Sequence, residues 1–83
     1  MSAAREVVEV VALALVDDPD AVVVTETDHR GTAVIELFVA ADDLGRVIGR
    51  QGRTASALRT LVAAAADHEG IKAMLEIREP DKR

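Results

Sequence analysis

Two glycines and two arginines lie close together near the middle of this 83-residue chain, an arrangement that suits the binding of a phosphate. They belong to one run, Val47-Ile48-Gly49-Arg50-Gln51-Gly52-Arg53. The glycines allow backbone conformations closed to other residues and let a ligand approach the main chain without a Cβ atom in the way. A helix that begins near Arg53 would point its free N–H groups and positive dipole end into the turn, which favours an anion.

The arginines of this region have no acidic neighbours in the sequence. Residues 44–66 contain four arginines and no acidic residue, namely Arg46, Arg50, Arg53 and Arg59. The whole chain carries −5 and this window +4, so the remaining residues carry −9. Because charges are screened over roughly 8 Å at cellular ionic strength, such a patch acts largely on its own. The window therefore indicates a site for a phosphate backbone.

Length and composition predict one small domain with an aliphatic core. Hydrophobic residues make up 49 % of the chain, and Phe38 is the only aromatic residue. We expect a single domain over residues 1–83, with an ordered core at about residues 2–79 and a polar tail at residues 80–83. The absence of cysteine excludes disulfides and thiolate metal sites. No apolar run approaches the ~18 residues needed to span a membrane, and no signal-peptide pattern is present, so we expect a cytoplasmic protein.

The hydrophobic pattern predicts a helix followed by a β-hairpin. Residues 2–16 suit an amphipathic helix with Ser2 as its N-cap. Its apolar positions are Val7, Val8, Val10, Val11, Ala14 and Leu15. Residues 21–27 and 32–40 are rich in β-branched residues, and Asp28-His29-Arg30-Gly31 separates them as a short loop. Apolar side chains on both faces of the second strand indicate a central position in a sheet.

Two more helices and a third strand complete the predicted fold. Asp42 or Asp43 can cap a short helix that ends at Gly49. A longer helix is expected over Arg53–His68, with an apolar face formed by Leu58, Leu61, Val62 and Ala65. Residues 71–78 alternate as a strand. The order α-β-β-α-α-β joins the last two strands by a two-helix crossover, which makes them parallel. We therefore predict an α+β fold with a three-stranded mixed sheet and three helices on one face.

This arrangement resembles the KH domain in its type II (prokaryotic) order, over nearly the whole chain. The run Val-Ile-Gly-Arg-Gln-Gly-Arg-Thr, followed by a leucine-containing helix, is similar to small bacterial single-KH proteins of the KhpA family. In KH domains a Gly-x-x-Gly loop clamps the backbone of about four single-stranded nucleotides, and the bases lie across an apolar groove. The resemblance implies that Gly49, Arg50, Gln51 and Gly52 clamp phosphates, with Ile48 as the apolar residue before them.

Two flanking arginines complete the RNA-binding set that we expect. Arg53 follows the loop in the first turn of the next helix, and Arg46 precedes it. By the same resemblance, Val47, Leu58 and one face of residues 32–40 would help to form the groove for the bases.

The resemblance implies a non-enzymatic protein that clamps short single-stranded RNA and acts as an RNA chaperone or post-transcriptional regulator. It also implies a homodimer, or a heterodimer with a larger KhpB/Jag-type KH protein. We expect no cofactor, no metal ion and no association with a membrane.

Other interpretations stay open at this point. A protein-interaction module could use the basic turn for an acidic partner, and it would then form an oligomer without affinity for RNA. An enzyme acting on phosphorylated small molecules has little support, because no acid–base pair accompanies the turn. His29 and His68 lack the partners of a metal site, although His29 and Arg30 could rim an RNA groove. The alanine run at residues 63–66 could be core or the seam of a dimer.

Overall fold

The computed structural model describes residues 2–80, so most of the polar tail expected at residues 80–83 lies outside the described part. Three helices and three strands follow one another within residues 2–80: α1 (Ala3–Leu15), β1 (Val23–His29), β2 (Thr32–Phe38), α2 (Leu44–Ile48), α3 (Arg53–His68) and β3 (Lys72–Arg78). Short 3-10 turns lie at Pro19–Ala21, Ala41–Asp43 and Arg50–Gly52. This order confirms the predicted α+β arrangement.

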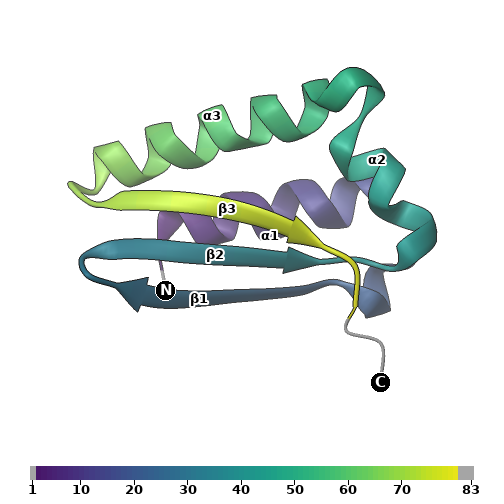
Figure 1. Ribbon diagram of the computed structural model, residues 1–83, viewed down its shortest axis with the longest axis horizontal. Coiled ribbons are helices and arrows are strands. Elements are labelled where there is room, and N and C mark those ends of the chain that lie inside the picture. Colours follow the sequence, from purple (N-terminus) through teal and green to yellow (C-terminus); the bar gives the residue numbers. More distant parts are fainter. Residues whose placement is uncertain (1, 81–83) are drawn as a thin grey trace.

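The sheet has the order β1-β2-β3, with β2 in the centre (Figure 1). β1 pairs with β2 in the antiparallel direction, and β3 pairs with β2 in the parallel direction, as the two-helix crossover requires. The hairpin between β1 and β2 lies at one end of the sheet, and α2 lies at the other end (Figure 1). None of the helices in the described part of the chain is long and apolar enough to cross a membrane.

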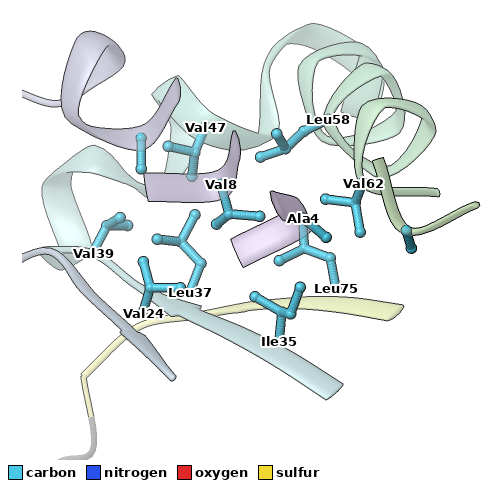
Figure 2. Close-up of a cluster of buried hydrophobic side chains, with 12 residues drawn as sticks. Ala4, Val8, Val24, Ile35, Leu37, Val39, Val47, Leu58, Val62 and Leu75 are labelled. Carbon is cyan, nitrogen blue, oxygen red and sulfur yellow. The ribbon is translucent and has the colours of Figure 1, made fainter. Parts of the chain in front are cut away.

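The hydrophobic core lies between the three helices and one face of the sheet (Figure 2). Alternate residues of the central strand point into it, and Ile35 and Leu37 are completely buried, as the pattern of residues 32–40 predicts. Small residues line the buried stripe of α1, which consists of Ala4, Val8 and Ala12. The buried stripe of α3 consists of Ala55, Leu58, Val62 and Ala66. The four alanines in these two stripes allow the helices to pack closely in the core.

Side chains on the open face of the sheet form an ion-pair network instead of a second core. Arg78 on β3 contacts Glu76 at 2.6 Å and Glu36 on the neighbouring strand at 2.9 Å. The hydrogen bond and charge of Glu76, and then the charge of Glu36, raise the pKa of the Arg78 guanidinium. The positive charge of Arg78 thus lies between two carboxylates and offsets their repulsion across the strands.

Three side chains expected in the core face the solvent. Val10 is 67 % exposed and Leu61 is 50 % exposed, and Ala14 is also exposed. The buried stripe of α3 runs through Leu58 and Val62, and a helix turns by about 100° per residue. Leu61 therefore lies to one side of the stripe, next to α1. On α1 the stripe passes through Val8 and Ala12, which turns Val10 and Ala14 outward.

The hairpin is tighter than the expected four-residue loop. β1 continues through His29, so that only Arg30 and Gly31 form the turn. Both have positive φ angles, +53° and +86°, as a two-residue turn of the I′ type requires. The usual sequence signal for this turn is an Asn-Gly or Asp-Gly pair. Here the pair is Arg30-Gly31, so the sequence does not indicate a two-residue turn.

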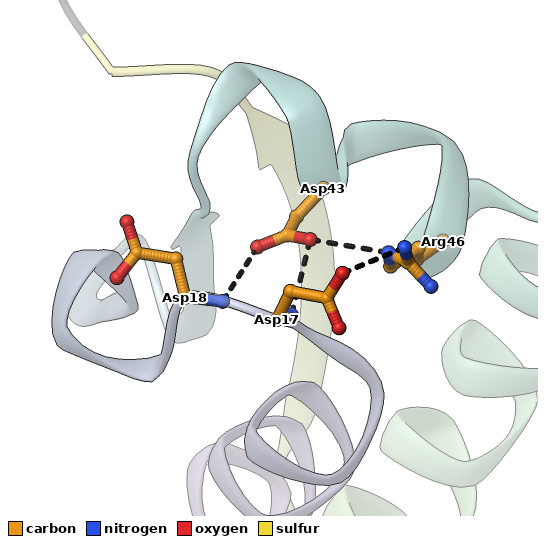
Figure 3. Close-up of polar contacts among 4 residues, drawn as sticks. All are labelled: Asp17, Asp18, Asp43 and Arg46. Carbon is orange, nitrogen blue, oxygen red and sulfur yellow. Dashed lines mark hydrogen bonds and ion pairs between the residues drawn. The ribbon is translucent and has the colours of Figure 1, made fainter.

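The carboxylate of Asp43 joins α2 to the segment that follows α1 (Figure 3). Asp43 occupies the N-cap position of α2, but its side chain makes no capping hydrogen bond there, in contrast to our expectation. It is only 2 % exposed, and it accepts hydrogen bonds from the amides of Asp17 at 3.1 Å and Asp18 at 3.0 Å. Ser2, by contrast, caps α1 as predicted, because its Oγ accepts from the amide of Arg5 at 3.1 Å.

Replacement of Asp43 by alanine should lower the free energy of unfolding by about 2–6 kcal/mol. The reason is that two backbone amides would lose their acceptors, at roughly 1–3 kcal/mol each. Urea unfolding followed by circular dichroism measures this change. The exposed neighbour Asp42 provides the control, since Asp42→Ala should change stability by less than ~0.5 kcal/mol. Equal stability of Asp43→Ala and the wild type would contradict this account of the linkage.

Candidate nucleic-acid interface

The glycine turn (residues 49–52) reverses the chain between α2 and α3. Three of its residues have positive φ angles: +76° at Gly49, +56° at Gln51 and +72° at Gly52. The amides of Gly49 and Gly52 bond to carbonyls of Gly45 and Gly49, at 2.9 and 3.1 Å. The amides of Arg50 and Gln51 take no part in these bonds, so within the described residues they are available to a ligand.

The two glycines are required for different reasons. A Cβ atom on Gly49 would lie 2.3 Å from Oγ1 and 2.7 Å from Cβ of Thr54 in the first turn of α3. Gly49 therefore permits the close approach of the two helices. A Cβ atom on Gly52 would meet nothing within 4 Å, so only its backbone conformation favours glycine there. Gln51 also has a left-handed backbone, at a cost of roughly 1–2 kcal/mol.

The start of α3 is open to an anion. Its N-cap residue is Gly52, which has no side chain to accept hydrogen bonds from the first amides of the helix. Those amides and the dipole of a 16-residue helix favour negative charge at this end. Nη2 of Arg53 donates to Oε1 of Gln51 at 3.1 Å, so the two long side chains are held together beside the turn.

The structure brings most of the expected RNA-binding residues together at the glycine turn. Arg46 instead forms ion pairs with two carboxylates. Ile48, the last residue of α2, is 38 % exposed next to Gly49. Arg50, Gln51 and Arg53 are all exposed around the turn. Nη2 of Arg46, however, lies 2.7 Å from Oδ2 of Asp17, and its Nε lies 3.3 Å from Oδ1 of Asp43 (Figure 3). Two carboxylates thus already neutralise the charge of Arg46.

The residues expected to form the groove are instead part of the core. Val47 is 0 % exposed and Leu58 is 1 % exposed, and the apolar face of residues 32–40 is covered by the helices. They support the site from below, but they present no surface to a ligand. The sequence shows that these residues are apolar, but it does not show which side of the sheet the helices cover.

A groove that is open to solvent lies between α3 and β3. It has a volume of about 310 Å³, at the lower end of the range for ligand sites. Its walls are formed by Arg59, Val62, Ala73, Met74 and Leu75. Arg59 lies six residues beyond Arg53 on α3, or about 9 Å along the helix axis. Sequence reasoning missed Ala73 and Met74, because only the packing of α3 beside β3 brings them to this groove.

Comparison with known proteins assigns the chain to a family. The profile of the family described as KhpA/KhpB, KH domain, matches residues 5–77. The chain belongs to this family. The resemblance expected from the glycine turn is thereby confirmed, and the mixed sheet with its parallel β2–β3 pair is the type II KH fold. The family consists of KH-domain proteins and is not an enzyme family.

Individual relatives are similar over almost their whole length. The chain is 53 % identical to the RNA-binding protein KhpA of Caldanaerobacter subterraneus subsp. tengcongensis, over 87 % of this chain and 96 % of the relative. It is 49 % identical to the RNA-binding protein KhpA of Aquifex aeolicus, over 95 % and 100 % of the two chains. The protein of the same name from Halalkalibacterium halodurans is 51 % identical, over 88 % and 96 %.

The histidines do not extend the site. His29 ends β1 and His68 ends α3, and both are exposed. Arg30 and His29 lie at the hairpin, at the opposite end of the sheet from α2 (Figure 1), so they do not rim the groove beside the glycine turn. Within residues 2–80, no group of three His, Cys, Asp or Glu residues is placed to hold a metal ion.

Alanine substitutions should separate the roles of the two glycines. We expect Gly49→Ala to be more destabilising than Gly52→Ala, since it adds a clash with Thr54 to a backbone cost of about 1–2 kcal/mol. Gly45 has open space and no positive φ, so Gly45→Ala is the control and should stabilise α2 by up to ~1 kcal/mol. Thermal unfolding of the three variants gives the order. Equal stabilities of Gly49→Ala and Gly52→Ala would show that the approach of Thr54 is unimportant.

Proposed function

We propose that this protein binds short single-stranded RNA at the glycine turn, without catalysing a reaction. One observation carries the proposal: two ligand-accessible amides, the uncapped start of α3 and two arginines converge on one small surface. Within residues 2–80 no carboxylate forms an ion pair with Arg50 or Arg53, so both charges are available to a phosphate. Relatives that carry the name RNA-binding protein, at about half identity, support this reading.

The arrangement of the glycine turn suits recognition of the RNA backbone more than of the base sequence. Phosphates would contact the amides of Arg50 and Gln51 and the side chain of Arg53. Contacts to phosphates carry no information about base identity. The bases would lie along the groove between α3 and β3. Such broad binding fits a cytoplasmic RNA chaperone or post-transcriptional regulator, which must hold many different transcripts.

We further propose that the protein works as a dimer. Apolar side chains on the outer surface of α1 and α3 surround a second groove of about 450 Å³, and Val10 and Leu61 are its most exposed members. A second copy of this chain would cover these side chains by presenting the same surface. A larger KhpB/Jag-type KH protein could take that place in a heterodimer. In the alanine run, Ala63 and Ala64 are exposed and Ala66 is core, and Ala63 lines a separate hollow beside β3.

Replacement of Arg50 and Gln51 by aspartate should abolish RNA binding and leave the thermal transition nearly unchanged, because both side chains are exposed. Fluorescence anisotropy of a labelled single-stranded RNA pool measures the affinity. For the wild type, the log–log slope against salt should be roughly −1 to −3 if two to four phosphates are bound. His29→Asp/Arg30→Asp is the matched control, since it makes the same change of charge at the far end of the sheet. Undiminished binding by Arg50→Asp/Gln51→Asp would refute the site.

Substitution Leu61→Glu should convert the dimer into a monomer, because it places a charge in the apolar contact. Size-exclusion chromatography with light scattering measures the mass, with and without RNA. Thr60 is an exposed neighbour on α3, so Thr60→Glu serves as the control and should leave the dimer intact. A dimer that persists in Leu61→Glu would place the interface elsewhere. An oligomer of the wild type with no RNA affinity would favour the interaction module that binds an acidic partner.

A further inference from the structure

Arg59 lies on α3, outside the glycine turn. It projects from α3 into the groove beside β3, and its Nε donates to the carbonyl oxygen of Leu75 at 3.3 Å. Its side chain is exposed, and in the described part of the chain no carboxylate forms an ion pair with it. The guanidinium is therefore held in place by a neutral backbone group and not by a carboxylate.

The carbonyl that holds Arg59 belongs to the free edge of the sheet. Val39 donates its amide to the carbonyl of Arg78 at 3.3 Å, which shows that the backbone groups of Arg78 point toward the β2 side. Successive residues of a strand direct their backbone groups to alternate sides. The N–H and C=O of Leu75, three residues earlier, therefore point away from β2 and into the groove. The bond from Arg59 agrees with this direction.

This combination makes the groove rich in donors. A guanidinium has five N–H groups in one plane, and only the Nε–H is used by Leu75. The four remaining N–H groups and the amide of Leu75 are donors, whereas the Leu75 carbonyl already accepts a hydrogen bond. Met74, which also lines the groove and is 48 % exposed, offers apolar surface to the flat face of a base.

Donors in this geometry distinguish guanine and cytosine from adenine and uracil. Guanine presents two adjacent acceptors, O6 and N7, which arginine binds with two hydrogen bonds. Cytosine presents the adjacent acceptors O2 and N3 on its Watson–Crick edge, which is accessible in a single strand. Adenine places an amino group beside each of its accessible acceptors, and uracil places an N–H between its two. Neither can therefore receive two parallel bonds from the guanidinium.

We propose that Arg59 reads one base of the bound RNA and makes the protein prefer guanine or cytosine at that position. The proposal rests on the RNA-binding function proposed above and adds a base preference to it. The glycine turn supplies affinity for any strand, and Arg59, held on the Leu75 carbonyl, supplies discrimination in the neighbouring groove.

The test uses short oligouridines with a single central guest base, A, C, G or U, and fluorescence anisotropy against the full chain. The wild type should bind the G or C guest about tenfold more tightly than the A and U guests. Arg59→Lys keeps the charge but loses the planar fork, and Arg59→Met removes both. Both variants should bind the four guests nearly equally and retain affinity for oligouridine. Arg30→Met, a remote arginine with the same loss of charge, should keep the wild-type preference.

Each outcome decides between the two proposals. Equal binding of the four guests by the wild type would overturn the role of Arg59, and so would a preference for G or C that survives in Arg59→Met. Neither result would contradict RNA binding at the glycine turn. Failure of the wild type to bind any oligonucleotide overturns the proposed function and this inference together. If thermal unfolding shows that Arg59→Met does not fold, the comparison of Arg59→Lys with the wild type decides.

Discussion

Because β2 and β3 run parallel, the chain that leaves β2 at Phe38 must travel the length of the sheet before it can enter β3 at Lys72. The helix α3 makes this return: its 16 residues span about 24 Å, close to the roughly 23 Å of a seven-residue strand. The reversal before α3 must therefore lie beyond the end of β2. This constraint places the glycine turn at one end of the sheet and runs α3 alongside the free edge of β3.

Local packing then determines how sharp that reversal is. α2 is only five residues long, and the contact of Gly49 with Thr54 brings it against the first turn of α3. Asp43 anchors the other end of α2 by accepting from two amides of the segment after α1. The position of the turn is thus fixed from both sides by contacts within the protein. Under the proposed function, a turn held in this way would bind a phosphate with little further loss of conformational entropy.

The parts of the fold that depend on local pattern could be predicted from the sequence. The bounds of α3, the central position of β2 and its parallel pairing with β3 follow from periodicity, glycine positions and the rules of chain connection. The differences arise where distant residues meet. Asp43 caps a segment 25 residues earlier instead of its own helix, and Arg46 pairs with Asp17. The window of four arginines therefore overstates the free positive charge, because nothing in the sequence marks Asp17 as a neighbour of Arg46.

The groove between α3 and β3 is a second feature that the sequence alone does not predict. Arg59 is an unremarkable helical arginine in the sequence, and Leu75 is an ordinary core leucine of a strand. Their relationship exists only because α3 returns beside the strand that follows it, which places a side-chain donor over a free carbonyl of the edge. The turn can be recognised from residue types alone, since its glycines permit the positive φ angles by which the chain reverses. Base preference requires particular donors at a particular edge, and the tertiary fold determines where these donors lie.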